Sequence, residues 1–265
     1  MSAVLPLDLS RYPIDDLESP AAHRLIEDCR RQIDETGLCL LPGFLPPDQV
    51  ERVVAEAEAG LPDAFHKERT IVAMNDHEID PSVSRDDLLW KAHRHSMEVI
   101  ATDRIADDSP IKVLYEWEGF SRFLSEVMGQ PVHRCVDPLI SLVITAMDPG
   151  GEQGWHFDDN DYVVSLLLQK PAVGGEFEYA PMIRSDTDPG WDRIRSAFAG
   201  TSDDVRIAPV EPGTLALFKG EKSVHRVSPV VAGPTRLIAL LSFDRRPGMV
   251  FPAKAQENNV GRTTS

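Results

Sequence analysis

The feature that most restricts the fold of this chain is a series of short apolar segments after Pro138, separated by turns rich in glycine and proline. Each segment has the length and composition of a β-strand. Short strands at regular spacing form a sandwich or a barrel, and a jelly roll suits the number of strands found here. The predicted strands cover residues 139–147, 162–169, 176–179, 205–210, 213–218, 224–230 and 236–243.

The sequence before these strands has a different pattern, in which apolar residues recur at helical spacing among charged ones. Gly37 is a natural end for the first helix, and the Pro46-Pro47-Asp48 run is a natural start for the second. The pattern predicts helices that lead into the β domain. The predicted elements are a helix over 21–36, a short buried strand over 38–41, a helix over 49–59 and a helical segment over 109–129.

Residues 61–110 are polar and rich in histidine and acidic side chains. A long polar segment of this kind in a compact protein is usually a lid or a substrate-binding insert. His93 and His95 lie close enough in sequence to suggest a second metal site, but packed or exposed histidines are far commoner than ligands. We therefore expect an irregular insert here.

Together these patterns predict a single domain, because 265 residues are enough for one large domain with a full core. The predicted fold class is α+β and mainly β, with a double-stranded β-helix (a jelly-roll, cupin-like core) and N-terminal helices. Residues 1–130 are expected to form helical support and a substrate insert, 131–250 the jelly-roll core, and 251–265 a polar tail that frays.

Charge and cysteine content narrow the possible partners. The formal net charge of -16 argues against nucleic acid and against an anionic membrane surface. Cys29, Cys39 and Cys135 lie far apart with no CxxC spacing, which favours a reduced interior. The amino terminus lacks the pattern of a signal peptide, and no apolar run approaches the ~20 residues that span a bilayer. We expect a soluble, cytoplasmic protein with a small-molecule partner; the oligomeric state stays open.

A candidate metal site begins at the His156-Phe157-Asp158 motif. In extended or tightly turned backbone, residues two apart point the same way, so this imidazole and this carboxylate can reach one point. A second imidazole from His225 would complete a 2-His-1-carboxylate facial triad. Such a triad leaves one face of a divalent metal open, as an iron(II) oxygenase needs for cosubstrate and dioxygen.

The motif alone is weak, and features downstream make it specific. The Pro212–Phe218 strand and its turn lead into Ser223-Val224-His225-Arg226-Val227, which brings His225 late into the barrel. Arg236 follows eleven residues later, at the head of an otherwise apolar strand. An arginine in that position needs an anionic partner to offset its burial. Gly174-Gly175-Glu176-Phe177 supplies a sharp turn between the two halves of the metal set.

In this order of motifs, residues 138–250 resemble the iron(II)/2-oxoglutarate-dependent dioxygenases. The resemblance implies that His156, Asp158 and His225 bind iron(II), and that Arg236 binds the distal carboxylate of 2-oxoglutarate through its bidentate guanidinium. Dioxygen is then the second cosubstrate, and 2-oxoglutarate is decarboxylated to succinate. Ser242, six residues after Arg236 on the same strand face, is expected to add a hydroxyl contact to 2-oxoglutarate.

A narrower resemblance lies in the run 155–169 and in the ending 240–248. These are similar to the bacterial group that contains amino-acid radical halogenases and their hydroxylase relatives. The halogenases carry Gly or Ala where Asp158 stands here, so the resemblance implies hydroxylation of an unactivated C–H bond in a free amino acid or close derivative. Asp159 is the candidate for the substrate ammonium, and Arg94 for its carboxylate.

Two other functions are compatible with the same motifs. One is desaturation or ring closure of an amino-acid-like or carrier-bound substrate in secondary metabolism, with the same cofactors. The other is a jelly-roll metal-binding module without turnover, which would not require the carboxylate clamp at Arg236. Glu176 and Glu178 could act as catalytic carboxylates, but their alternating pattern is more typical of a solvated strand edge.

Overall fold

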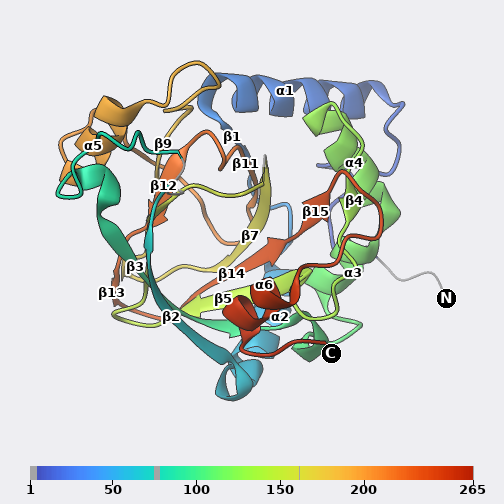
Figure 1. The fold of residues 1–265 in the computed structure, drawn as a ribbon. Helices are drawn as coiled ribbons and strands as arrows, with labels where there is room; N and C mark the ends of the chain where they lie inside the picture. The colour runs from blue at the N-terminus through green and yellow to red at the C-terminus, as the bar shows by residue number, and fades with distance from the viewer. Residues whose placement is uncertain (1–4, 75–77, 161, 265) are drawn as a thin grey trace.

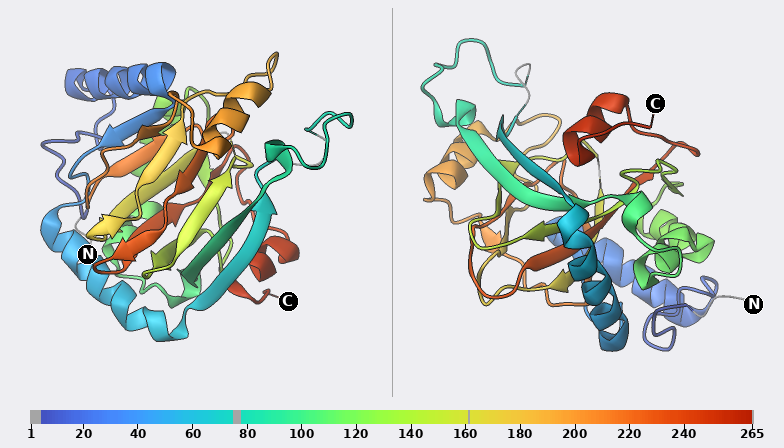
Figure 2. Two further views of the ribbon diagram at one scale, coloured as in Figure 1. Left: turned by 90° about the vertical axis from the view of Figure 1, so that its left-hand side faces the viewer. Right: turned by 90° about the horizontal axis from the view of Figure 1, so that it is seen from below.

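The computed structural model describes residues 5–74, 78–160 and 162–264. Within these residues the body of the protein is one curved antiparallel sheet of eleven strands, with the first four helices on its outer side (Figure 1; Figure 2). The strands of the sheet are β1 (Leu38–Leu41), β2 (Phe65–Val72), β3 (Ala92–Ile100), β5 (Leu142–Met147), β6 (Glu152–His156), β7 (Val163–Gln169), β9 (Phe177–Ala180), β10 (Arg206–Ile207), β11 (Leu215–Phe218), β12 (Val224–Val227) and β14 (Arg236–Leu241).

The sheet has two halves that β3 joins. One half runs in the order β1-β11-β7-β14-β5, and the other in the order β6-β12-β9-β10. β3 pairs with β5 on one side and β6 on the other, and β2 pairs with β3. The predicted mainly β, jelly-roll architecture is confirmed. Two small ladders complete it, β8 (Val173–Gly174) with β13 (Val230–Ala232) and β4 (His133–Arg134) with β15 (Phe243–Asp244).

Helices cover the first half of the sheet and bury its outer face. Side chains of β5, β7, β11 and β14 pack there with those of the first four helices in one apolar cluster. α5 packs instead at the other end of the molecule, beside the 3-10 turn Leu88–Trp90. The helices are α1 (Pro20–Thr36), α2 (Pro47–Gly60), α3 (Pro110–Glu116), α4 (Glu118–Met128), α5 (Trp191–Ala199) and α6 (Ala253–Val260).

α1 ends where the sequence predicts. Gly37 adopts the left-handed conformation with φ of 70°, and its N–H donates to the Ile33 carbonyl at 2.8 Å. Glycine has no Cβ to clash in this conformation, so the helix stops there and β1 starts at the next residue. The helical segment over 109–129 is two helices, because extended backbone at Trp117 separates α3 from α4.

Two expectations are wrong, and both concern polar sequence. Residues 61–110 contain β2 and β3, which pair over eight residues and belong to the main sheet. Their polar composition reflects strands with one face outside the barrel, where side chains such as Glu68 are solvated. The C-terminal segment forms α6 instead of a frayed tail, because the buried Gln256 amide donates to the Asp137 carboxylate at 2.7 Å.

No helix among the described residues combines the length and the apolar character that crossing a membrane requires.

Candidate metal centre

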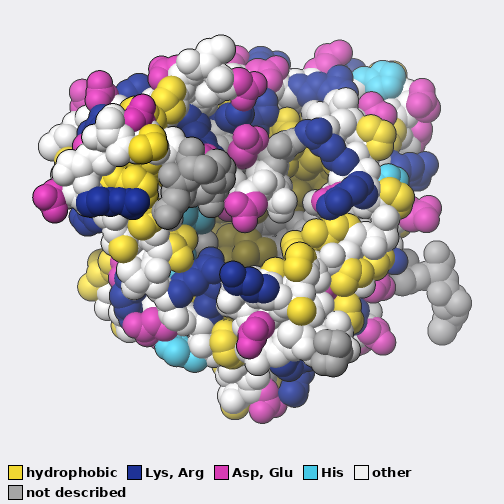
Figure 3. Space-filling model, in the orientation of Figure 1, with side chains coloured by type: hydrophobic (Ala, Val, Ile, Leu, Met, Phe, Trp, Pro, Cys, Tyr) yellow, Lys and Arg dark blue, Asp and Glu magenta, His cyan; other side chains and the backbone are white. Residues whose placement is uncertain are grey.

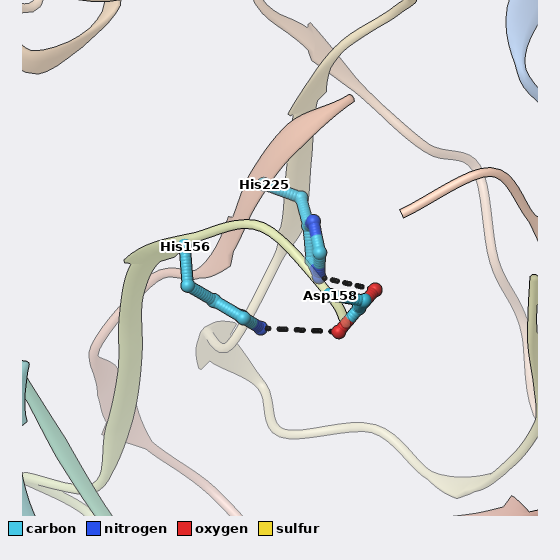
Figure 4. Close-up of side chains that lie close together, drawn as sticks. All are labelled: His156, Asp158 and His225. Carbon is cyan, nitrogen blue, oxygen red and sulfur yellow. Dashed lines mark ion pairs between the residues drawn. The ribbon is translucent and has the colours of Figure 1, made fainter. Parts of the chain in front are cut away.

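The three predicted ligands lie together on the inner side of the sheet (Figure 4). His156 is the last residue of β6, Asp158 follows in the next turn, and His225 lies on β12 directly opposite His156 in the ladder. One ligand atom from each lies within 4.8 Å of the other two. The Asp158 carboxylate oxygens lie 3.7 Å from His156 Nε2 and 3.2 Å from His225 Nε2.

Backbone carbonyls orient both imidazoles. His156 Nδ1 lies 2.8 Å from the Gly154 carbonyl, and His225 Nδ1 lies 2.9 Å from the Ser223 carbonyl. A carbonyl only accepts, so each Nδ1 donates its proton and each Nε2 keeps a lone pair. Both lone pairs point to the same point as the carboxylate. This is the orientation by outer hydrogen bonds that metal-binding histidines have.

Gly220 makes room for the Asp158 side chain. The Asp158 N–H donates to the Gly220 carbonyl at 3.2 Å, which brings the two backbones together. A Cβ on Gly220 would lie 1.7 Å from Asp158 Oδ2 and 2.9 Å from its Cβ. Glycine is therefore required at this position for steric reasons. The residues around Gly220 gave no sign of this role in the sequence, because the contact is long-range.

Burial and mutual charge set the protonation of the cluster. Burial lowers the pKa of His156 well below its usual value, and His225 lowers it further. Burial alone would raise the pKa of Asp158, but the two histidines outweigh it and lower the pKa. Burial opposes charge on His225 as well, yet Asp158 raises its pKa. Asp158 therefore favours a proton on His225 while no metal is bound, and a divalent metal ion binds the neutral imidazole by displacing that proton. Two imidazoles and a carboxylate are a ligand set that fits iron(II).

Arg236 is buried at the head of β14, with 3% of its surface exposed. Its Nε donates to the Gly175 carbonyl at 2.9 Å, while Nη1 has no hydrogen-bond partner among the described residues. Burial lowers the pKa of Arg236 to about 10, and the negative charge of Glu176 partly offsets this lowering. An orphaned, buried guanidinium requires an anion, and a carboxylate of 2-oxoglutarate would satisfy it.

A cavity of about 340 Å³ connects the metal-binding cluster to Arg236. Alternation along β14 explains this, because Arg236, Ile238 and Leu240 face the cavity while Leu237 and Ala239 pack in the apolar core. Ser242 also lines the cavity, and its hydroxyl donates to the Ile140 carbonyl at 3.4 Å. Asp159 lies at the cavity wall beside Asp158.

The structure does not bring Arg94 to this cavity. Arg94 lies between His93 and His95 on β3, so its side chain leaves the strand on the opposite face from theirs. Its guanidinium donates to the Gly150 carbonyl at 2.8 Å and pairs with Glu68 and Glu152 at 3.3 Å. The expected carboxylate-binding role therefore has no support, because Arg94 lies on the outer face of β3 and is paired there.

Two further residues of the site were missed. Gln153 lines the cavity, and its Nε2 lies 3.1 Å from His156 Nε2. His95 packs its ring 5.1 Å from the His156 ring, and burial lowers its pKa to about 3. In the structure His93 and His95 are buried while Arg94 between them is exposed, the alternation of a strand with one solvated face. It marks a strand and not a second metal site.

The model of one protein family, described as Halogenase D, matches residues 21–249 of the chain. The matched range includes β6 and β12, which carry the two histidines. No curated protein gives a significant match to the sequence.

Several solved structures share the fold at low sequence identity. An oxidoreductase of the 2OG-Fe(II) oxygenase family from Burkholderia pseudomallei is 18% identical with a TM-score of 0.53, over 84% of this chain and 92% of that one. The non-haem α-ketoglutarate-dependent carbocyclase SnoK of nogalamycin biosynthesis is 15% identical with a TM-score of 0.54, over 90% and 93%. A prolyl-4-hydroxylase from Pseudomonas putida is 14% identical with a TM-score of 0.50, over 82% and 97%. The resemblance to 2-oxoglutarate oxygenases is thus confirmed at the level of fold.

Proposed function

The chain belongs to the Halogenase D family, and from this premise we propose that it is an iron(II)- and 2-oxoglutarate-dependent oxygenase that hydroxylates an amino acid or a close derivative. The proposal rests on one cavity that is lined both by the possible metal ligands His156, Asp158 and His225 and by Arg236. The Nη1 group of Arg236 is buried without a hydrogen-bond partner among the described residues. A metal-binding module without turnover would not need a buried arginine that is free to bind a carboxylate.

In this proposal His156, Asp158 and His225 hold iron(II), and Arg236 holds the distal carboxylate of 2-oxoglutarate. When bound, iron(II) with 2-oxoglutarate and dioxygen supplies the oxidising power for C–H cleavage, and succinate and carbon dioxide are released. The Gly154 and Ser223 carbonyls keep the imidazole protons on Nδ1. Apolar side chains such as Val143, Ile238 and Leu240 limit water in the cavity.

Asp158 decides the proposed outcome between hydroxylation and halogenation. A halide needs an open position on the metal, and the Asp158 carboxylate fills the position that Gly or Ala leaves open in the halogenases. The choice of an amino-acid-like substrate rests on Asp159, whose carboxylate borders the cavity next to the metal cluster. An ammonium group is the natural partner of a carboxylate at that place.

The test supplies the protein with iron(II), 2-oxoglutarate, air and each free amino acid in turn. The expected result is a product heavier by one oxygen atom, with one succinate formed for each product molecule. A product lighter by two hydrogens would establish desaturation or ring closure instead. Oxidation of carrier-bound or peptidyl amino acids alone would reject the free substrate. Metal binding without any iron-dependent succinate formation would reject the enzyme itself.

A further inference from the structure

Two cationic side chains, those of Lys67 and Arg69, lie on the inner face of β2. Lys67 and Arg69 are two residues apart, so they share one face of the strand. They stand opposite Met97 and His95 in the ladder with β3, both of which are buried. His95 in turn stands opposite Gln153, which lines the cavity. Arg69, His95 and Gln153 thus form a row that leads across the sheet to the metal-binding cluster.

Lys67 is linked to the cavity wall by a hydrogen bond to a residue of α6. Its Nζ donates to Asn259 Oδ1 at 2.5 Å, and Asn259 lines the cavity. No carboxylate of the described residues lies within ion-pairing distance of Lys67, although burial lowers its pKa to about 8. A desolvated ammonium group with only an amide partner is costly, and a bound anion would offset that cost.

Arg69 is also without an ion pair in the described part of the chain. The acid that acts on it is Asp159 of the cavity wall, which partly offsets the lowering of the Arg69 pKa by burial. The Arg69 side chain is exposed to solvent and therefore free to contact a ligand. Figure 3 shows Lys and Arg side chains along the border of the hollow at the centre of this face.

The charged side chains that line the cavity among the described residues are Arg236, Asp158 and Asp159. Lys67 and Arg69 lie behind this lining, Lys67 hydrogen-bonded to Asn259 and Arg69 under the influence of Asp159. Arg236 is assigned to 2-oxoglutarate and Asp158 to the metal. Asp159 then remains for a substrate ammonium group, and Lys67 and Arg69 remain as two cations. An amino acid with a neutral side chain brings one carboxylate, whose two oxygens can contact both cations but whose single negative charge neutralises only one of the two positive charges.

We propose that the substrate carries a second anionic group, so that Lys67 and Arg69 together bind an amino acid with an acidic side chain. This inference rests on the proposed function and names its substrate class. The second anion is a carboxylate or a phosphate ester, since both suit an ammonium and a guanidinium. A basic amino acid is disfavoured, because Asp158 and Asp159 are the only carboxylates among the described residues of the cavity wall.

The test is a binding measurement with matched pairs of ligands. Aspartate is compared with asparagine, glutamate with glutamine, and O-phosphoserine with serine, by calorimetry on protein loaded with iron(II) and 2-oxoglutarate in the absence of oxygen. The acidic member of at least one pair is expected to bind roughly tenfold or more tightly, as one charge-assisted contact allows. The pair with the larger ratio identifies the anion as carboxylate or phosphate. Equal binding in all three pairs, or tighter binding of the neutral members, overturns the inference.

Variants locate the effect. Lys67→Met removes the charge and keeps most of the side-chain length, and Arg69→Gln removes the charge of a more exposed residue while keeping a polar side chain. Each is expected to reduce the acidic-to-neutral ratio severalfold. Lys254→Met removes a charge from the exposed surface of α6 and should leave the ratio unchanged. Full preference in both Lys67→Met and Arg69→Gln would overturn the assignment.

This failure is distinguishable from failure of the proposed function. Hydroxylation of a neutral or basic amino acid would overturn the inference and leave the oxygenase standing. The absence of iron-dependent succinate formation with every substrate would reject the oxygenase, whereas the binding ratios are measured without turnover.

Discussion

His156 and His225 stand directly opposite each other on the antiparallel strands β6 and β12, with ring centroids 4.1 Å apart. The backbone ladder therefore fixes the spacing of the two imidazoles before any ion binds. Asp158 follows within the next turn, where Gly220 gives it room. A centre held by register in this way is preorganised, so we expect metal binding to change the backbone little.

Replacing either histidine should abolish metal-dependent turnover. His156→Ala removes one neutral nitrogen ligand and is expected to reduce both the bound iron(II) per chain and the succinate formed to background. His133→Ala, an exposed histidine on β4, is the matched control and should bind iron like the parent protein. Succinate formation by His156→Ala near the parent rate would show that the ligand set is wrong.

Gly220→Ala should lower the affinity for iron(II), although Gly220 is not itself a ligand. The new Cβ would overlap the Asp158 carboxylate, so the carboxylate must turn away and iron(II) affinity should fall at least tenfold. Gly60→Ala is the control, since a Cβ there meets Ile100 only at an ordinary 3.5 Å. Metal titration and the Tm of both variants separate a lost ligand from a lost fold. Unchanged affinity in Gly220→Ala would contradict the close packing.

Arg236→Gln should weaken 2-oxoglutarate binding by ~2–5 kcal/mol, because the distal carboxylate would be buried without its cation. The measurement is the affinity of the iron-loaded protein for 2-oxoglutarate. Arg193→Gln, which breaks an exposed pair with Asp204, serves as the control and should not change that affinity. An Arg236→Gln protein that binds 2-oxoglutarate normally would exclude the clamp.

Lys67 should leave a signature in the pH dependence of stability. Burial, and to a smaller extent Arg69, lower the pKa of Lys67 from 10.5 to about 8. Between these two pH values the unfolded chain binds the proton that the folded chain has lost. The free energy of unfolding therefore gains up to ~3 kcal/mol from this group as pH rises through that window.

Comparison with Lys67→Met isolates this contribution from other groups. The variant should be the more stable protein at pH 7, with an advantage that shrinks toward pH 10.5. Urea unfolding of the metal-free proteins at several pH values measures the difference. An advantage that does not change with pH would mean that Lys67 titrates normally. Lys254→Met should show no such trend.

The sequence predicted those parts of the site whose residues are close together or fall in an ordered series of motifs. His156 and Asp158 are two residues apart, and His225 and Arg236 follow in a recognisable order, so their assembly could be anticipated. The partner of Arg94 could not, because Glu68 and Glu152 come from strands whose pairing depends on the whole sheet. Gly220 and Asn259 are contributed by remote segments in the same way.

The fold was predictable to a similar extent and for the same reason. α1 and β1 are set by local periodicity and by Gly37, and both appear where expected. β2 and β3 were missed because the inner positions carry Lys67, Arg69 and histidines where a strand pattern would show apolar residues. Lys67 and Arg69 are the cations to which we assign a substrate anion, so the break in the strand pattern coincides with the proposed binding surface.

The alternation along β14 has a consequence for how this protein folds. A slip of one residue in its pairing with β5 and β7 would turn Arg236 into the apolar core and Leu237 into the cavity. Such a misregistered chain would bury a guanidinium among leucines and lose its clamp in the same step. Arg236 therefore also favours the correct register of β14, because a barrel assembled with this strand shifted by one residue would be much less stable than the native one.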